Sequence, residues 1–354
     1  MLDTERTDLL GKFLEKSMED GAFPGACFGI ASGRDAFTGC MGYAMLQPIK
    51  RGIREDSIFD LASLSKVIAT TTAVLILMEN GEIRLYDKVK DILPEYRHED
   101  TTIFQLLTHT SGLPAEIKFY RVCRDYKEMT GRLYETELEY SPGSKVVYSD
   151  LGFMLLGLII EKVSGQPLDA FVHRYIAAPL CMTDTCYNPP EEVKDRCVAT
   201  EVSEERGVIA GRVHDGNANM MGGVSGHAGL FSTLPDLMKF AEMILNDGCC
   251  GDKRILSRGT VDLMDSCHTG GLNVRRGLGW ELKTPGGSMG DLASDDALYH
   301  TGFTGTSMLI DRKYGLAFIL LTNRAYPSRE NQKLIRLRGN INNIAMSALQ
   351  TGKD

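Results

Sequence analysis

The 354-residue sequence has no run of lysine and arginine, no long apolar stretch and no C-x-x-C pair. Its formal net charge is -8 at pH 7, so we expect no binding to nucleic acid or to an anionic membrane surface. The longest apolar stretches, such as Phe153 to Ile160, are far shorter than the roughly 20 residues that a membrane-spanning helix needs. We therefore expect no membrane span.

The nine cysteines are odd in number and scattered along the chain. They have neither zinc-ribbon nor thioredoxin-like spacing, and His109, His214 and His227 lack the H-E-x-x-H spacing of a metal site. The sequence thus predicts no metal and no cofactor. The first residues, MLDTERTDLLGKFLEK, have no features of a secretory signal, so we expect a cytoplasmic protein with reduced thiols, and a removed leader is the alternative.

The composition is that of an ordinary globular protein, with 43% hydrophobic and 24% charged residues, and the length favours about two domains. Apolar periodicity predicts helices over residues 2–20, 64–80, 151–163, 234–246 and from about 328 onward. Strand-like runs occupy residues 26–32, 36–41, 277–282, 298–301, 307–311 and 316–322.

Strands near both chain ends, with helices between them, predict an α/β protein of the α+β type. We expect an antiparallel sheet that is built from both chain ends and flanked by terminal helices, with a mostly helical region inserted. The predicted sheet domain comprises residues 1–60 and 228–354, and the predicted helical domain comprises residues 61–227. A cleft between two domains is the usual place for an active site, so we expect the site at this interface.

Ser63-Leu64-Ser65-Lys66 is the only S-x-x-K sequence in the chain, although chance alone predicts about one such match. Its position is more informative, because Ser63 lies where an irregular stretch meets an apolar helix and Lys66 follows one turn later on the same side. A serine needs a neighbouring base to become a nucleophile, and a lysine that is screened from water can serve. The alternative is an N-cap serine beside a solvated lysine.

Tyr148-Ser149-Asp150 comes just before the predicted helix at 151–163. A tyrosine in this position can reach into a cleft, and next to a lysine ammonium its phenol is pushed toward the phenolate, the form that accepts a proton. Tyr148 is therefore a candidate base beside Lys66. The alternative is a buried aromatic residue with a satisfied hydroxyl.

His300-Thr301-Gly302-Phe303 lies on a late predicted strand. The small Gly302 would let a substrate lie alongside that strand, and the Phe303 N–H would then face the Ser63 N–H as a second donor to an oxyanion. The alternatives are a surface histidine at 300 and a bulge at 302.

In their order and spacing these segments resemble the serine β-lactamase and penicillin-binding-protein superfamily, in its branch of class C β-lactamases, family VIII esterases and D-peptidases. The similarity spans nearly the whole chain and is carried by FDLASLSKV (59–67), LLTHTSGLP (106–114), YSDLGFMLLG (148–157), GHAGLFST (226–233) and HTGFTGTS (300–307). It implies a two-domain fold and an acyl-enzyme mechanism. In that mechanism Ser63 attacks a carbonyl, Lys66 and Tyr148 relay its proton, and the Ser63 and Phe303 N–H groups hold the oxyanion.

Two positions depart from the pattern of that superfamily. His300 stands where penicillin-hydrolysing members have the lysine of K-T-G, which helps to hold the substrate carboxylate, and a histidine is mostly neutral at pH 7. Asp150 stands where class C enzymes have asparagine, and its carboxylate would keep Lys66 protonated and shift the role of base toward Tyr148. We expect the catalytic residues to be Ser63, Lys66, Tyr148 and His300, and the substrate-binding residues to be Asp150, Thr301, Gly302 and Phe303.

We therefore expect a serine hydrolase that forms an acyl-enzyme at Ser63 on small esters or amides, with esterase activity first. A D-alanyl-D-alanine carboxypeptidase or penicillin-binding protein and a weak β-lactamase are the alternatives. A catalytically silent binding or scaffold protein is the alternative from another class, but it would be expected to have lost Ser63, Lys66 or Tyr148. The expected partner is a small-molecule ester, amide or D-peptide substrate.

Overall fold

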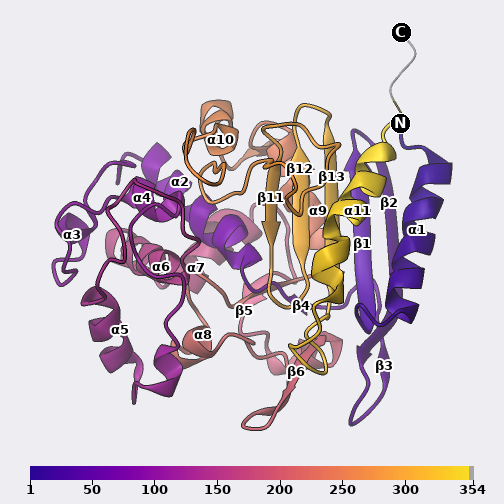
Figure 1. Cartoon of the computed structure of the whole chain (residues 1–354), viewed down its shortest axis with the longest axis horizontal. Helices are drawn as coiled ribbons and strands as arrows, with labels where there is room; N and C mark the ends of the chain where they lie inside the picture. The colour runs from indigo at the N-terminus through magenta and orange to yellow at the C-terminus, as the bar shows by residue number, and fades with distance from the viewer. Residues whose placement is uncertain (351–354) are drawn as a thin grey trace.

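The computed structural model describes residues 1–350. In Figure 1 a sheet with helices on both faces forms one side of the molecule, and a group of helices forms the other. The helices of the sheet side are α1 (Thr4–Glu19), α9 (Leu234–Leu245) and α11 (Lys333–Ser347), and α10 (Arg258–Asp265) lies at the top of this view between β11 and the other group of helices.

The helices of the other side come mainly from the middle of the chain, as the sequence predicts. They are α2 (Thr72–Glu79), α3 (Val89–Ile92), α4 (Ile103–Leu107), α5 (Tyr126–Tyr134), α6 (Asp150–Ser164), α7 (Leu168–Val172) and α8 (Gly216–Met220). Short 3₁₀ and π-helical turns accompany them at η1 (Lys66–Thr71), η2 (Phe119–Arg121), η3 (His173–Ala177) and η4 (Glu191–Arg196).

The main sheet has six antiparallel strands in the order β11-β12-β13-β1-β2-β3. Their bounds are β1 (Gly25–Ser32), β2 (Asp35–Met45), β3 (Arg51–Gly52), β11 (Leu298–Thr301), β12 (Ser307–Asp311) and β13 (Leu316–Thr322). In its middle β1 pairs with β13, with Ala26 opposite Thr322, so strands from the two chain ends lie side by side. This confirms the prediction of an antiparallel sheet built from both ends of the chain.

Both faces of this sheet are buried, which explains why β13 reads as the continuous apolar run LAFILLT. Phe318 and Leu320 belong to the core under α1 and α11, whereas Ile319 and Leu321 belong to the larger core that includes α9. Successive side chains of a strand point to opposite faces, so one strand supplies both cores.

Three smaller sheets complete the fold. They are β4 (Phe59–Asp60), β8 (Leu230–Ser232) and β5 (Cys186–Tyr187) in the order β4-β8-β5, then β6 (Ala199–Ser203) with β7 (Gly207–Ala210), and β9 (Cys249–Cys250) with β10 (Lys253–Arg254). The Leu61 N–H donates to the Leu230 carbonyl at 3.0 Å, which extends the β4-β8 pairing to within two residues of Ser63. The start of the segment that holds the candidate nucleophile is therefore fixed by a strand.

Two expected elements differ in the structure. The strand predicted at residues 277–282 is wrong, because this segment is a tight loop held by single bridges of Glu281 to Arg276 and to Tyr299. Gly279 has a φ of +80°, and a Cβ on it would lie 2.2 Å from the Thr71 hydroxyl, so the backbone turns and packs where a strand would continue. The last helix begins at Lys333 rather than near 328.

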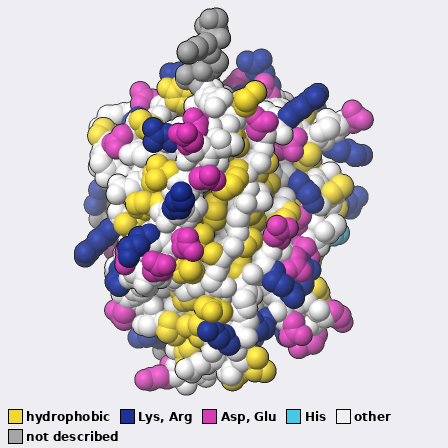
Figure 2. All heavy atoms as spheres, turned by 90° about the vertical axis from the view of Figure 1, so that its right-hand side faces the viewer, with side chains coloured by type: hydrophobic (Ala, Val, Ile, Leu, Met, Phe, Trp, Pro, Cys, Tyr) yellow, Lys and Arg dark blue, Asp and Glu magenta, His cyan; other side chains and the backbone are white. Residues whose placement is uncertain are grey.

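Charge and hydropathy are distributed over the surface without one dominant feature on the face that Figure 2 shows. Lys and Arg side chains alternate there with Asp and Glu side chains. Among residues 1–350 no single helix is long and apolar enough to cross a bilayer, and only α6 and the following helix through Ala177, bent by 77° relative to each other, reach that length and hydropathy together.

The backbone of the segment before β8 packs directly against the backbone of α6. A Cβ on Gly226 would lie 2.1 Å from the Phe153 carbonyl oxygen and 2.8 Å from the Gly157 nitrogen. We expect Gly226→Ala to lower the free energy of unfolding by about 1–3 kcal/mol, because the segment must move away from the helix, and to lower Tm accordingly.

The matched control is Gly11→Ala in α1, where a Cβ would meet nothing within 4 Å. Alanine is favoured over glycine inside a helix by about 1 kcal/mol, so this variant should keep or raise Tm. Calorimetry of both variants decides the matter, and equal changes in Tm would mean that the crossing at Gly226 does not control stability.

Candidate active site

Ser63 lies in a strained turn between β4 and η1. Ala62 has a φ of +47°, in the left-handed region that costs a non-glycine residue roughly 1–3 kcal/mol. The buried carboxylate of Asp60 holds this turn by accepting the Ala62 N–H at 2.9 Å and the His214 N–H at 2.7 Å. The turn thus presents Ser63 at the start of a buried helix.

Lys66 is fully buried, and its ammonium lies among three oxygen atoms. Nζ donates to Ser63 Oγ and to the His227 carbonyl, each at 2.9 Å, and forms an ion pair with Asp150 Oδ1 at 2.7 Å. Burial lowers the pKa of Lys66, but the Asp150 carboxylate and Tyr148 outweigh burial, so the pKa is raised above its usual value. This confirms the expectation that Asp150 keeps Lys66 protonated.

Tyr148 completes this group, with its ring centre 5.0 Å from Lys66 Nζ and its hydroxyl beside Lys66 and Ser63. Burial raises the pKa of Tyr148, and the Asp150 carboxylate raises it further, whereas the Lys66 ammonium lowers it. The pKa is raised overall. The expectation that the phenol is pushed toward the phenolate is therefore wrong, because burial and a nearby carboxylate outweigh the ammonium.

His300 lies on β11, with its ring centre 5.9 Å from that of Tyr148. Its Nδ1 lies 3.0 Å from the Thr301 carbonyl, and because a carbonyl only accepts, Nδ1 carries the hydrogen. Burial, together with the Arg276 and Lys66 charges, holds the pKa of His300 well below its usual value. His300 is therefore neutral at pH 7, as expected, and Nε2, which has no hydrogen-bond partner among residues 1–350, is an acceptor that cannot donate to a carboxylate.

The segment after β11 is tied to the turn that carries Ser63. Thr304 Oγ1 donates to the Asp60 carbonyl at 2.8 Å, and Thr306 Oγ1 donates to the Leu61 carbonyl at 3.0 Å. Within the described residues, neither the Ser63 N–H nor the Phe303 N–H donates to another group of the chain. The structure thus holds the two segments that carry these N–H groups against each other, and such a pair of donors suits an oxyanion.

Gly302 is required here by close packing of the chain, a reason that the sequence does not show. A Cβ on Gly302 would lie 2.1 Å from Thr306 Oγ1 and 2.4 Å from the Leu61 carbonyl oxygen. The glycine therefore lets two parts of the chain approach each other. Thr301 ends β11 and is half-buried, and Phe303 beyond it is 45% exposed.

Two residues of this group, His109 and Arg276, were missed by sequence reasoning. His109 is a buried loop residue, and its ring centre lies 4.6 Å from that of Tyr148. Its Nδ1 accepts the Ser149 N–H at 3.0 Å, so the neutral ring carries its hydrogen on Nε2, which has no partner among residues 1–350. The motif LLTHTSG holds this residue, but nothing in its local sequence shows that the ring packs on Tyr148.

Arg276 is the less predictable of the two, because it lies in the loop mistaken for a strand. Its guanidinium carbon is 5.6 Å from the Tyr148 ring centre, the residue is 6% exposed, and Nε has no hydrogen-bond partner in the described chain. Its Nη2 forms an ion pair with Glu281 Oε2 at 3.7 Å, a separation too long for a hydrogen bond. A buried guanidinium with free donors faces the candidate site.

A second group of polar side chains holds the His227 carbonyl that accepts from Lys66. The ring of His227 lies between Asp215 and Ser225, with Nε2 2.8 Å from Asp215 Oδ1 and Nδ1 2.7 Å from Ser225 Oγ. His227 is buried, and the interactions with His227 and Lys66 hold the pKa of Asp215 far below its usual value against the effect of burial. These bonds fix the carbonyl that accepts from Lys66.

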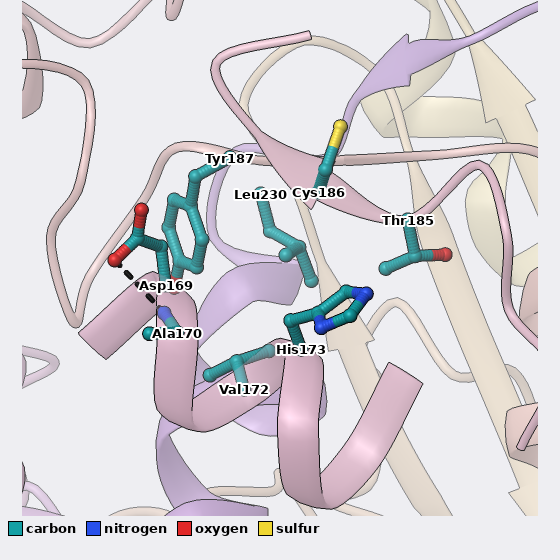
Figure 3. Close-up of a pocket in the computed structure, with 8 residues that line it drawn as sticks. All are labelled: Asp169, Ala170, Val172, His173, Thr185, Cys186, Tyr187 and Leu230. Carbon is teal, nitrogen blue, oxygen red and sulfur yellow. Dashed lines mark hydrogen bonds between the residues drawn. The ribbon is translucent and has the colours of Figure 1, made fainter. Parts of the chain in front are cut away.

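Among residues 1–350 no group of three His, Cys, Asp or Glu side chains is arranged to hold a metal ion. A cavity of about 210 Å³ lies between α7, η3, β5 and β8, and Figure 3 shows its lining residues. They include Asp169, His173 and Tyr187 but none of the residues expected in the active site. The Asp169 carboxylate accepts the Ala170 N–H at 2.8 Å, and the cavity is separate from the candidate site because none of the residues of that site lines it.

Comparison with known proteins agrees with this geometry. The sequence profile of the beta-lactamase family matches residues 10–343. An "N-acetylmuramyl-L-alanine amidase" of Bacillus subtilis (strain 168) is 32% identical, over 91% of this chain and 82% of that protein. A "Putative D-alanyl-D-alanine carboxypeptidase" of Escherichia coli (strain K12) is 35% identical, over 82% of this chain and 74% of that protein.

The fold is likewise that of known structures. A "Beta-Lactamase/D-Alanine Carboxypeptidase" from Pseudomonas syringae superimposes with a TM-score of 0.77 at 19% identity, over 98% of this chain and 100% of that chain. At this identity the likeness concerns the fold alone. It confirms the expected arrangement of an antiparallel sheet and helices.

The charge of Asp150 should set the pH dependence of this group. Asparagine keeps an oxygen near Lys66 but removes the charge, so the pKa of Lys66 and the pKa of Tyr148 both fall. A base works only when it is deprotonated, and we expect the rising limb of the pH profile of kcat/KM for an ester to move to lower pH by about one unit or more in Asp150→Asn. The exposed Asp91→Asn in α3 is the control, and an unmoved limb in Asp150→Asn would contradict the assignment.

Proposed function

The chain belongs to the beta-lactamase family, and from this premise we propose that it hydrolyses small esters or amides through an acyl-enzyme at Ser63. The observation that carries the proposal is the buried contact of Ser63 Oγ with Lys66 Nζ at 2.9 Å, with Asp150 on the same ammonium at 2.7 Å. A serine hydroxyl becomes a nucleophile when a neighbouring group can take its proton, and here that group is built into the helix start.

In the proposed reaction the substrate carbonyl oxygen lies between the Ser63 and Phe303 N–H groups. Ser63 Oγ attacks the carbonyl carbon, and its proton passes to whichever of Lys66 and Tyr148 has lost its own proton. The tetrahedral intermediate collapses, the leaving alcohol or amine takes that proton, and the acyl group stays on Ser63. Water then attacks the acyl ester with the same groups in reverse, which releases the acid and restores the serine.

The raised pKa values of Lys66 and Tyr148 explain why the proposed reaction uses both residues. Lys66 and Tyr148 are both protonated at rest, because the pKa of each is raised. Either one, once deprotonated, lies close to Ser63 and beside the other as a proton donor. Acylation is therefore faster as pH rises, and the protonated partner remains available for the leaving group.

Substitution of the nucleophile tests this proposal directly. We expect Ser63→Ala to abolish hydrolysis of p-nitrophenyl butyrate and labelling by a fluorophosphonate, because both require the Ser63 oxygen. Ser347→Ala, at the end of α11, is the matched control and should keep both. Turnover that survives in a folded Ser63→Ala would refute the acyl-enzyme at this serine, and a wild-type chain without turnover or labelling would favour the silent binding protein.

Arg276 favours a second candidate, a D-alanyl-D-alanine carboxypeptidase. The substrate of such an enzyme ends in a carboxylate, and His300 is neutral, so it supplies no charge to hold that group. A guanidinium with free donors suits a carboxylate by both charge and shape. The printed names of the Bacillus subtilis and Escherichia coli relatives, an amidase and a carboxypeptidase, also support amide substrates.

The two candidates differ in how much they need Arg276. For a peptide that ends in D-Ala-D-Ala we expect Arg276→Gln to lower kcat/KM by about 10- to 100-fold, since a hydrogen bond to a charged group contributes about 1.5–3 kcal/mol. For neutral p-nitrophenyl butyrate the change should be much smaller. Arg275→Gln, at the half-buried neighbour, is the control. Equal losses on both substrates would remove the case for a carboxylate anchor, and a chromogenic cephalosporin in the same panel tests the weak β-lactamase.

A further inference from the structure

Two arginines lie behind the Gly302–Phe303 segment without an acidic partner. Arg324 is 2% exposed and Arg338 is 7% exposed, and within residues 1–350 neither forms an ion pair. The Nε atom of each is also without a hydrogen-bond partner in this part of the chain. Burying an uncompensated charge costs several kcal/mol, so a fold retains one only where it gains something else.

Both arginines donate to the backbone of residues 302–306, and Arg324 also donates to the segment before α11. Arg338 Nη2 donates to the Gly302 carbonyl and to the Thr306 carbonyl, each at 3.3 Å. Arg324 Nη2 donates to the Phe303 carbonyl at 2.6 Å, and its Nη1 donates to the Asn331 carbonyl at 2.7 Å. The carbonyls of Gly302 and Phe303, which belong to the peptide groups before and after the Phe303 Cα, therefore each accept a hydrogen bond from a buried guanidinium.

The Gly302 carbonyl and the Phe303 N–H belong to the same peptide group. This group is planar, so an acceptor contact that fixes the carbonyl also fixes the direction of the N–H on its other side. A cation that polarises the carbonyl makes the N–H a stronger donor, because hydrogen bonds in series reinforce one another. The two guanidinium charges also place a positive potential at this end of the site.

We propose that Arg338, with Arg324 beside it, is a positioning residue of the oxyanion hole, which orients and polarises the Gly302–Phe303 peptide for the negative oxygen formed at the acyl carbonyl. The inference rests on the proposed acyl-enzyme chemistry at Ser63 and adds a residue that touches neither substrate nor nucleophile. Burial lowers the pKa of Arg338, and burial together with Arg338 lowers that of Arg324 to about 10. A guanidinium in a protein stays protonated at pH 7.

A purely structural role for Arg338 would give a different result. If it served only to hold the turn between β11 and β12, its loss would lower stability and affect ground-state binding and turnover alike. A role in the oxyanion hole predicts a loss confined to states in which the carbonyl oxygen carries negative charge. Phenylboronic acid provides such a state, because Ser63 Oγ adds to the trigonal boron, no group leaves, and a negatively charged tetrahedral adduct forms.

The experiment compares wild type, Arg338→Met, Arg338→Lys and the control Arg336→Met, which removes an exposed arginine from the same helix. For Arg338→Met we expect kcat for p-nitrophenyl butyrate to fall about 10- to 100-fold, less than the 10²–10³ for loss of a donor itself, because the N–H remains. KM should change less than about threefold, and the phenylboronic acid affinity should fall by the same factor as kcat/KM. Arg338→Lys should lie between, since it keeps the charge and loses the fork, and Arg336→Met should match wild type.

A folded Arg338→Met with unchanged turnover and unchanged boronic acid affinity would overturn the inference, as would a loss that appears in KM alone. If Arg338→Met does not fold, Arg338→Lys decides, and wild-type affinity for phenylboronic acid in that variant overturns the inference equally. A wild-type chain that neither hydrolyses the ester nor binds the boronic acid would refute the proposed function itself. The wild-type arm thus separates failure of the two proposals.

Discussion

The buried ammonium of Lys66 is the constraint on which the rest of the site depends. A charge with no exposure to water must be surrounded by acceptors, and here they come from three distant segments: Ser63, Asp150 and the carbonyl of His227. Each segment has its own anchor, respectively the strained turn after β4, the start of α6 and the hydrogen-bonded His227 ring. The ammonium therefore fixes the relative placement of the turn, the helix and the segment before β8, and with them the surroundings of the candidate nucleophile.

Much of this arrangement could be predicted from local sequence. The three-residue spacing from Ser63 to Lys66 places both on one side of a helix start, and the strands at both chain ends indicate the antiparallel sheet. The effect of Asp150 on Lys66 was also predictable, because opposite charges at short range raise the pKa of a lysine regardless of the fold. These inferences depend on spacing or on charge, which a sequence displays directly.

The errors of the prediction concern burial and long-range contacts, which a sequence does not display. The predicted direction of the pKa shift of Tyr148 was wrong because the effect of burial outweighs that of the neighbouring ammonium. The prediction of a strand at 277–282 was wrong because Gly279 lets the backbone of this segment pack closely against Thr71 in η1. Arg276 and Arg338 were missed for the same reason, since a lone arginine in a loop or on a helix has no sequence pattern that marks it as buried. Gly302 was identified correctly as special, but its neighbours, Leu61 and Thr306, are visible only in three dimensions.

The pairing of β1 with β13 also determines the order in which the molecule can form during synthesis. β1 and β2 leave the ribosome almost 300 residues before β13, the strand that pairs with the other edge of β1. Until β13 is made, they form a hairpin in which one edge of β1 has no partner. Contacts of such large sequence separation form late and slowly, whereas the helices in the middle of the chain can pack on one another soon after synthesis. Phe303 and Arg338 follow all of these helices in the chain. The nascent chain therefore has its serine and lysine long before it has a place for an oxyanion, so the candidate site is complete only after the segment through Arg338 has been made.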